Sequence, residues 1–293
     1  MVELPGVPEA FTLFRKPLYH LPYRPDLAKK QQEKLDQALK DWEDDPENVE
    51  KIIELGRQYA YMGQYRRAIA IFTMGLERYP EDPWLYRHRA HRFLTLRLFE
   101  HAIEDSRLAV RYMEGRPDEV EHSGLPGSEH LEIYSLPTNT YYHLGLAQYA
   151  KGELGEAAGS FRRLIEVARN DDHTVMGAYW LYMILRRLGE EDEASALLET
   201  ITVDMEIHVS ANYHHCLLAH RGEMDAEAIL EAAREESSLG VTASGNGIAN
   251  WFKFNSQKER YVELLKEVVS TDAWSGFGYI IAEADLHRMG ETP

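Results

Sequence analysis

The sequence predicts an all-α protein in which pairs of helices stack into a solenoid of about six repeats. Copies of one pattern of apolar and small residues are centred on Gly56, Ala90, Gly145, Tyr182, His215 and Ala249, in steps of 34, 55, 37, 33 and 34 residues. Each copy contains two amphipathic stretches separated by a turn, which is typical of a helix pair. Such pairs bury their apolar faces only when neighbouring pairs stack, so the repeats are expected to form one array.

Two segments precede the array. Residues 1–25 contain five prolines among several aromatic residues, and this composition predicts an extended arm. Asp26 is then a candidate N-cap for a helix that carries Leu35, Leu39 and Trp42 on its apolar side. Residues 26–48 are therefore predicted to form an N-terminal capping helix.

Residues 49–276 are predicted to be the array itself. Within it, Ala68, Ala102, Ala157 and Ala194 are small residues that allow the second helix of a pair to approach the first closely. The step of 55 residues contains an insert at 115–137, rich in glycine and proline, which we expect to fold over the mouth of a groove near His88 and His143.

The last part of the array and the segment after it have their own signals. Gly240–Gly247 is rich in glycine and is predicted to be a connection, with Ser244 or Asn246 capping the helix that follows. Residues 277–293 are predicted to form a C-terminal capping helix, because a stacked array needs its last apolar face covered.

The first copy of the pattern resembles the tetratricopeptide repeat (TPR) family. It contains Leu55, Gly56, Tyr59, Gly63, Tyr65, Ala68, Phe72 and Pro80, and the 34-residue step is the period of that family. The resemblance covers residues 49 to 275 and implies a right-handed superhelix. The segments YRHRAHR, YHLGLA, WLYMILRRLG and GFGYIIAEADL are also similar to a group of bacterial TPR proteins of uncharacterised function.

Composition restricts the partners and the location that we expect. The net charge of −17 disfavours contact with nucleic-acid phosphates, and the short apolar runs do not suit a membrane helix. The first residues lack the basic and apolar regions of a signal peptide, so a cytoplasmic location is expected. The single cysteine, Cys216, excludes a disulfide within the chain and is most simply a small buried residue.

The TPR resemblance implies a ligand site, because the concave wall of such arrays comes from the first helix of each pair. Carried over to this chain, the wall consists of arginine, histidine and aromatic side chains that contrast with the acidic composition of the rest. The predicted ligand-binding residues are Arg57, Tyr61, Trp84, Arg87, His88, His91, Tyr142, His143, Tyr179, Trp180, Arg186, Arg187, Tyr213 and Asn250. Arginine pairs with carboxylate or phosphate, so the leading hypothesis is a protein-interaction module that binds an anionic peptide or small molecule.

Two alternatives remain open at this stage. The arginines could pair with nearby carboxylates and the tyrosines could pack between helices, which would make the groove purely structural. Alternatively, the histidines, tyrosines and arginines could form the site of a hydrolase or acid–base enzyme under the insert. His88, His91 and His143 could then hold a metal, although an HxxH pair is more often solvated or stacked. The sequence has no assembled catalytic or cofactor motif, so no catalytic residue is assigned and no cofactor is expected.

Overall fold

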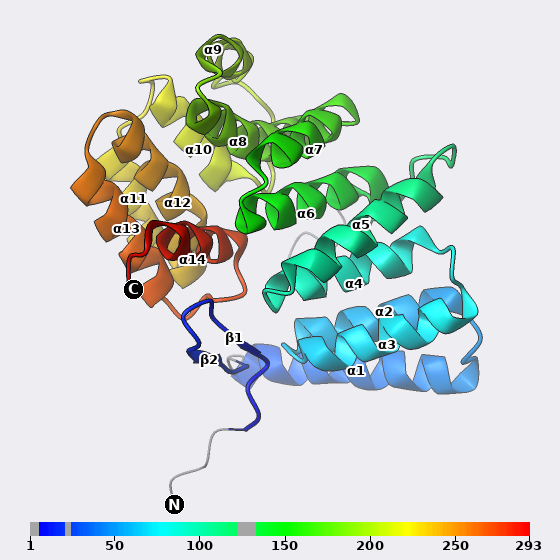
Figure 1. Cartoon of the computed structure of the whole chain (residues 1–293). Helices are drawn as coiled ribbons and strands as arrows, with labels where there is room; N and C mark the ends of the chain where they lie inside the picture. The colour runs from blue at the N-terminus through cyan, green and yellow to red at the C-terminus, as the bar shows by residue number, and fades with distance from the viewer. Residues whose placement is uncertain (1–5, 21–24, 122–132) are drawn as a thin grey trace, which may run out of the picture. The chain divides into compact units, whose positions relative to one another are not determined.

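The computed structural model of the chain describes residues 6–20, 25–121 and 133–293. Contacts divide the chain into two compact units, Met1–Arg116 and Pro117–Pro293. Regular structure in the described residues is almost entirely helical, with two short antiparallel strand pairs (Figure 1). The prediction of an all-α solenoid of helix pairs is therefore confirmed.

Unit 1 begins with a small hairpin in the predicted arm. Strands β1 (Ala10–Phe11) and β2 (Pro17–Leu18) pair antiparallel. The backbone amide of Arg66 donates to the Glu9 carboxylate and its side chain donates to the Glu9 carbonyl, so the hairpin is anchored to the start of a helix.

The helices of unit 1 form two pairs preceded by one helix. They are α1 (Pro25–Asp44), α2 (Val49–Tyr61), α3 (Tyr65–Arg78), α4 (Pro83–Thr95) and α5 (Phe99–Met113). Helix α2 packs on α3 and α4 on α5, while α1 covers α2. Because α1 begins at Pro25, Asp26 lies in its first turn and is not the N-cap that the sequence suggested.

Unit 2 contains four helix pairs and one final helix. They are α6 (Leu136–Lys151), α7 (Leu154–Glu166), α8 (Asp171–Leu188), α9 (Glu191–Glu199), α10 (Ala211–His220), α11 (Ala226–Glu236), α12 (Ser238–Phe254), α13 (Lys258–Ser270) and α14 (Phe277–Met289). Ahead of them, β3 (Val120–Glu121) pairs with β4 (Tyr134–Ser135), so the two ends of the predicted insert meet. The middle of the insert, 122–132, lies outside the described residues. The predicted fold of the insert over a groove therefore also lies outside them.

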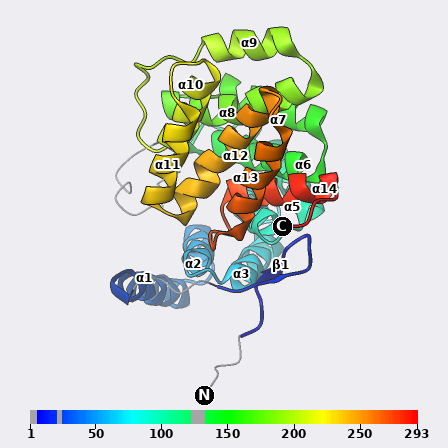
Figure 2. The same cartoon turned by 90° about the vertical axis from the view of Figure 1, so that its left-hand side faces the viewer.

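The first helices of the pairs in unit 2 form a ring with α14. Helix α6 contacts α8, α8 contacts α10, α10 contacts α12, and α12 contacts α14. Helix α14 also contacts α6, and Figures 1 and 2 both show these two helices side by side. The final helix therefore does more than cover the last pair, because it joins the end of the unit to its beginning.

Small residues make this packing possible, as the sequence predicted for Ala68, Ala102, Ala157 and Ala194, which are at most 1% exposed. The prediction for Gly240–Gly247 was wrong, since these residues lie inside α12, whose N-cap is Ser237. A Cβ atom on Gly247 would lie 2.7 Å from the Tyr179 ring and 2.8 Å from the Cys216 sulfur. The glycines of α12 thus allow close helix packing. In a sequence, a glycine with this role cannot be distinguished from a glycine in a loop.

No helix in the part of the chain that the structure describes combines the length and apolar character needed to cross a membrane.

Candidate functional site

The predicted site residues of unit 1 contact one another on α2 and α4. His88 is buried and stacks on Phe72 at 5.5 Å and on Trp84 at 6.1 Å between ring centroids. Its Nδ1 lies 2.7 Å from Nη1 of Arg87, which is also buried. On α2, Arg57 pairs with Glu54 at 3.1 Å and donates to the Tyr61 hydroxyl at 3.3 Å.

His91, the last predicted site residue of unit 1, bonds to the guanidinium of Arg92. His88 and His91 belong to unit 1 and His143 to unit 2. Within the described residues, no group of three or more histidine, cysteine, aspartate or glutamate side chains is placed to hold a metal ion.

In unit 2, the predicted aromatic wall is the inside of the helix ring. Tyr142, Tyr179 and Trp180 are each at most 3% exposed. Trp180 Nε1 donates to the Tyr142 hydroxyl at 3.3 Å, and that hydroxyl lies 3.0 Å from the hydroxyl of Tyr213. Tyr213 stacks on Tyr179 at 4.1 Å. Burial raises the pKa of all three tyrosines, that of Tyr213 to about 12, so their hydroxyls stay neutral.

His143 is part of the same packed interior. It is 3% exposed, and its ring lies 5.4 Å from that of Phe277 at the start of α14. The final helix therefore supplies one of the walls around this histidine.

Arg187, predicted to bind a ligand, pairs with a carboxylate of the chain itself, that of Asp285 on α14. Its Nη1 donates to Oδ1 of Asp285 at 2.9 Å and its Nη2 to Oδ2 at 2.5 Å. Nη2 also donates to Oδ1 of Asn250 at 2.7 Å and to the Tyr261 hydroxyl at 3.1 Å. Nη2 of Arg288 also donates to Oδ1 of Asp285. The interior of the ring in unit 2 is thus occupied by the chain's own side chains.

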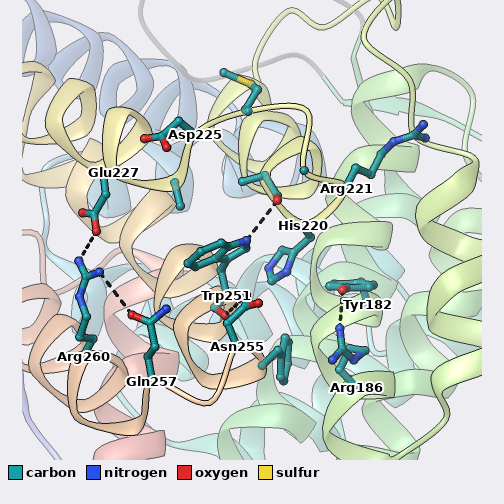
Figure 3. Close-up of a pocket in the computed structure, with 15 residues that line it drawn as sticks. Tyr182, Arg186, His220, Arg221, Asp225, Glu227, Trp251, Asn255, Gln257 and Arg260 are labelled. Carbon is teal, nitrogen blue, oxygen red and sulfur yellow. Dashed lines mark hydrogen bonds and ion pairs between the residues drawn. The ribbon is translucent and has the colours of Figure 1, made fainter.

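Arg186, the neighbour of Arg187, points instead into an open cavity of about 450 Å³ at one end of the ring (Figure 3). This volume lies within the range of about 300–1,000 Å³ that is usual for ligand pockets. We call it the α8–α12 cavity, because it forms where α8, α10 and α12 end and α11 and α13 begin. The residues that line it include Tyr182, Arg186, His220, Arg221, Asp225, Glu227, Trp251, Phe254 and Arg260.

The guanidinium of Arg186 lies against two aromatic rings that also contact each other. It lies 4.6 Å from the centre of the Phe254 ring and 5.8 Å from that of Tyr182, and its Nη1 donates to the Tyr182 hydroxyl at 2.8 Å. Its Nε faces the Glu191 carboxylate at 2.7 Å. Among the described residues Nη2 has no hydrogen-bond partner. One edge of this guanidinium is thus open to a further acceptor.

The middle of the cavity is aromatic and uncharged. The Trp251 indole is oriented by a hydrogen bond from its Nε1 to the Ala219 carbonyl at 3.2 Å. The His220 ring lies 4.7 Å from Tyr182 and 5.8 Å from Phe254. Burial lowers the pKa of His220 to about 3, so its imidazole is neutral at physiological pH.

The opposite end of the cavity is acidic. Asp225 is the N-cap of α11, and its Oδ1 accepts from the Ala228 amide at 2.8 Å. Glu227, in the first turn of α11, forms an ion pair with Arg260. Arg260 in turn lies over the Phe252 ring at 3.8 Å. Charge therefore changes sign along the cavity, from Arg186 at one end to Asp225 at the other (Figure 3).

The sequence analysis predicted Arg186 as a ligand-binding residue but did not point to Asp225, Trp251 or Phe254. Asp225, Trp251 and Phe254 lie near the ends of their helices, whereas the TPR resemblance points to the faces of the first helices. Aromatic and charged residues recur near the turns that end successive first helices, whose C-caps are Arg221 and Asn255. This recurrence is a sequence signal that could have identified the residues of the cavity.

Cys216 does not contribute to a reactive site. It is fully buried, its sulfur lies 3.5 Å from the Ser244 carbonyl, and burial raises its pKa well above the ordinary value. The thiol therefore stays protonated and behaves as a small apolar side chain, as the sequence reasoning expected.

Comparison with known proteins gives likenesses in structure. No family model and no curated protein matches the sequence. YrrB, a TPR protein with an unusual peptide-binding site, is similar with a TM-score of 0.46 and 14% identity over 86% of this chain and 97% of YrrB. A tetratricopeptide repeat protein from Parabacteroides merdae gives 0.46 and 13% identity over 87% of this chain and 97% of that chain. A thermophilic TPR protein from Thermus thermophilus gives 0.41 and 17% over 82% and 100%. The repeat family that the sequence resembles is thus also the family of these three structures.

Proposed function

We propose that this chain is a binding protein that holds an anionic ligand with an apolar body in the α8–α12 cavity. The observation that carries the proposal is the guanidinium of Arg186, which lies against the rings of Phe254 and Tyr182 with Nη2 open to an acceptor. A carboxylate on this edge gains a charge-assisted hydrogen bond worth about 1.5–3 kcal/mol. The rings of Trp251 and Phe254 provide apolar surface for the rest of the ligand.

The location differs from the concave wall that the sequence predicted. In unit 2, Tyr142, Trp180 and Arg187 are buried against the chain's own helices, so a ligand at these side chains would have to displace α14. Arg186 faces an opening that needs no such displacement. For this unit we therefore assign ligand binding to the end of the helix ring.

A catalytic function receives less support from this unit. Burial raises the pKa of Tyr142 and of the Cys216 thiol, and it lowers that of His220 to about 3. These shifts move each group away from the pKa near neutrality that suits a general acid or base at physiological pH. The arrangement favours binding without turnover.

The experiment compares 3-phenylpropionate with 3-phenylpropionamide, which share the ring and differ in the charge. Binding to the full chain is measured by NMR titration. We expect the carboxylate to bind at least ten-fold more tightly than the amide, and Arg186→Met to remove that preference. Arg162→Met is the matched control, because Arg162 also pairs with carboxylates, Glu190 and Glu193, but on the outer side of α7 away from the cavity.

Equal affinities for the two compounds, or an Arg186→Met protein that keeps the preference, would contradict the proposal. Thermal melting of each variant shows whether it is folded, so that a loss of binding can be assigned to the missing guanidinium.

A further inference from the structure

The two ends of the α8–α12 cavity differ in charge, and each end has one charged group that the protein does not fully neutralise. At the first end, Arg186 faces Glu191 at Nε, but Glu191 belongs to the start of α9 and its side chain is 59% exposed. An exposed ion pair of this kind contributes little to stability, so a ligand carboxylate can compete with it.

At the second end, the two carboxylates are not equivalent. Glu227 is neutralised by Arg260, whose guanidinium is itself held over the Phe252 ring. Asp225 accepts one hydrogen bond from a backbone amide, and among the described residues no lysine, arginine or histidine forms an ion pair with it. Its carboxylate therefore keeps a negative charge that a ligand cation can pair with.

Between the two ends the middle of the cavity is aromatic, and the charged Arg221 at its side is paired with Glu223. The Trp251 indole and the neutral His220 imidazole separate Asp225 from Arg186, as Figure 3 shows. A ligand that spans this distance meets aromatic surface in the middle, a guanidinium at one end and a carboxylate at the other.

We propose that the ligand is zwitterionic: a short peptide that places a carboxylate against Arg186, an aromatic or aliphatic side chain along Trp251, and an amino group near Asp225. This inference rests on the proposed function and adds the cationic half of the ligand. A dianion such as phosphate fits less well, because Asp225 would repel it at one end of the cavity.

The experiment uses four forms of the tripeptide alanine–phenylalanine–alanine: both ends free, N-acetylated, C-amidated, and blocked at both ends. Affinities for the full chain are measured by NMR titration or calorimetry at low ionic strength. Acetylation is expected to weaken binding about five-fold or more. Amidation should weaken it about ten-fold, because the acceptor for Arg186 is lost.

Two substitutions assign each effect to one end of the cavity. Asp225→Asn should reduce the effect of acetylation to less than two-fold and leave the effect of amidation unchanged, since asparagine still caps α11. Arg186→Met should reduce the effect of amidation to less than two-fold and leave the effect of acetylation unchanged. Asp192→Asn, a change in the first turn of α9 that does not line the cavity, should leave both effects unchanged.

The outcomes separate this inference from the proposal on which it rests. If amidation weakens binding but acetylation does not, or if Asp225→Asn does not alter the effect of acetylation, the cavity binds anions and the zwitterionic ligand is rejected. If neither the tripeptides nor 3-phenylpropionate bind, both proposals fall.

Discussion

Arg187 on α8 and Asp285 on α14 lie 98 residues apart in the sequence and form a two-pronged ion pair in the interior of unit 2. The two side chains are 9% and 2% exposed. Together with Arg288 and the Tyr261 hydroxyl, they attach the final helix to the helices that precede it. The charges are nearly excluded from water, so their pairing should dominate the response of this unit to mutation and to acid.

Asp285→Asn is expected to destabilise the protein by about 3–5 kcal/mol, because it leaves the buried guanidinium of Arg187 without its counter-charge. The control is Glu193→Gln, which breaks an ion pair with Arg162 whose side chains are 46% and 37% exposed. That change should cost at most about 1 kcal/mol. Urea denaturation followed by circular dichroism measures both. Similar losses of unfolding free energy in the two variants would mean that the buried ion pair stabilises the protein no more than the exposed one.

The pH dependence of Asp285 should be visible in the same measurement. Burial alone would raise its pKa, but the guanidiniums of Arg187 and Arg288 outweigh burial and hold the pKa below its ordinary value. A carboxylate of this kind contributes stability that is present above the unfolded-state pKa, about 3.9, and is lost as the pH falls through the lower folded-state value. The wild-type protein should therefore lose stability more steeply than Asp285→Asn below about pH 4. Parallel curves would contradict the assignment.

His220 affects the stability of the protein over a higher pH range than Asp285 does. Burial lowers its pKa to about 3, with the nearby Arg186 acting in the same direction. Between the unfolded-state pKa, about 6.5, and the folded-state value, only the unfolded chain takes up the proton, so stability should fall by about 1.4 kcal/mol per pH unit as the pH decreases.

Between pH 6 and pH 4, His220→Gln should reduce this slope by the contribution of one histidine, about 1.4 kcal/mol per pH unit. His208→Gln is the control, since the His208 side chain is 44% exposed. Denaturant unfolding at half-unit pH intervals gives the slopes, and an unchanged slope in His220→Gln would show that His220 is protonated in the folded protein.

Two helical glycines should respond to alanine in opposite ways. Gly159 lies within α7 and has open space where a Cβ would be, so Gly159→Ala should stabilise the protein by up to about 1 kcal/mol through helix propensity. Gly247→Ala gains the same propensity but meets the Tyr179 ring at 2.7 Å and the Cys216 sulfur at 2.8 Å. Overpacking of this kind costs about 1–3 kcal/mol, so the net effect should be a loss. A stabilised Gly247→Ala protein would show that α12 can move away from α8.

Asp172 organises the segment before α10. Its buried carboxylate accepts from the backbone amides of His208, Val209 and Ser210 at 2.8–2.9 Å. Asp172→Asn loses part of this acceptor capacity, at a cost of about 1–3 kcal/mol for groups left unsatisfied. Amide hydrogen exchange at 208–210 should accelerate. The neighbouring Asp171 bonds one amide, that of Glu206, so Asp171→Asn should change exchange at that position alone.

The fold could be predicted from the sequence because its signals are local and repeated. Ala157 and Gly145 are small where two helices of a pair meet, and the structure buries Ala157 and places Phe161 against Gly145. The glycines of α12 were misread, since a glycine that admits a neighbouring helix and a glycine that permits a turn look the same in one sequence. Only the partner, here Tyr179, distinguishes them.

The candidate site was predicted less well for a similar reason. Arg186 and Arg187 are adjacent and carry the same charge, yet Arg187 is neutralised by Asp285 and Arg186 opens onto the cavity. This difference depends on a contact between α8 and α14, which lie far apart in the sequence of unit 2. No local sequence pattern around residue 187 predicts that contact.

The attachment of α14 to α6 also bears on the order of events during synthesis. The inner helices emerge from the ribosome one after another, but Arg187 has no buried counter-charge until residues 277–289 have been made. An unfinished chain therefore holds a polar, incomplete interior and should remain loosely packed. Unit 2 is expected to reach its final compactness only after translation has passed its last helix, in a single late step.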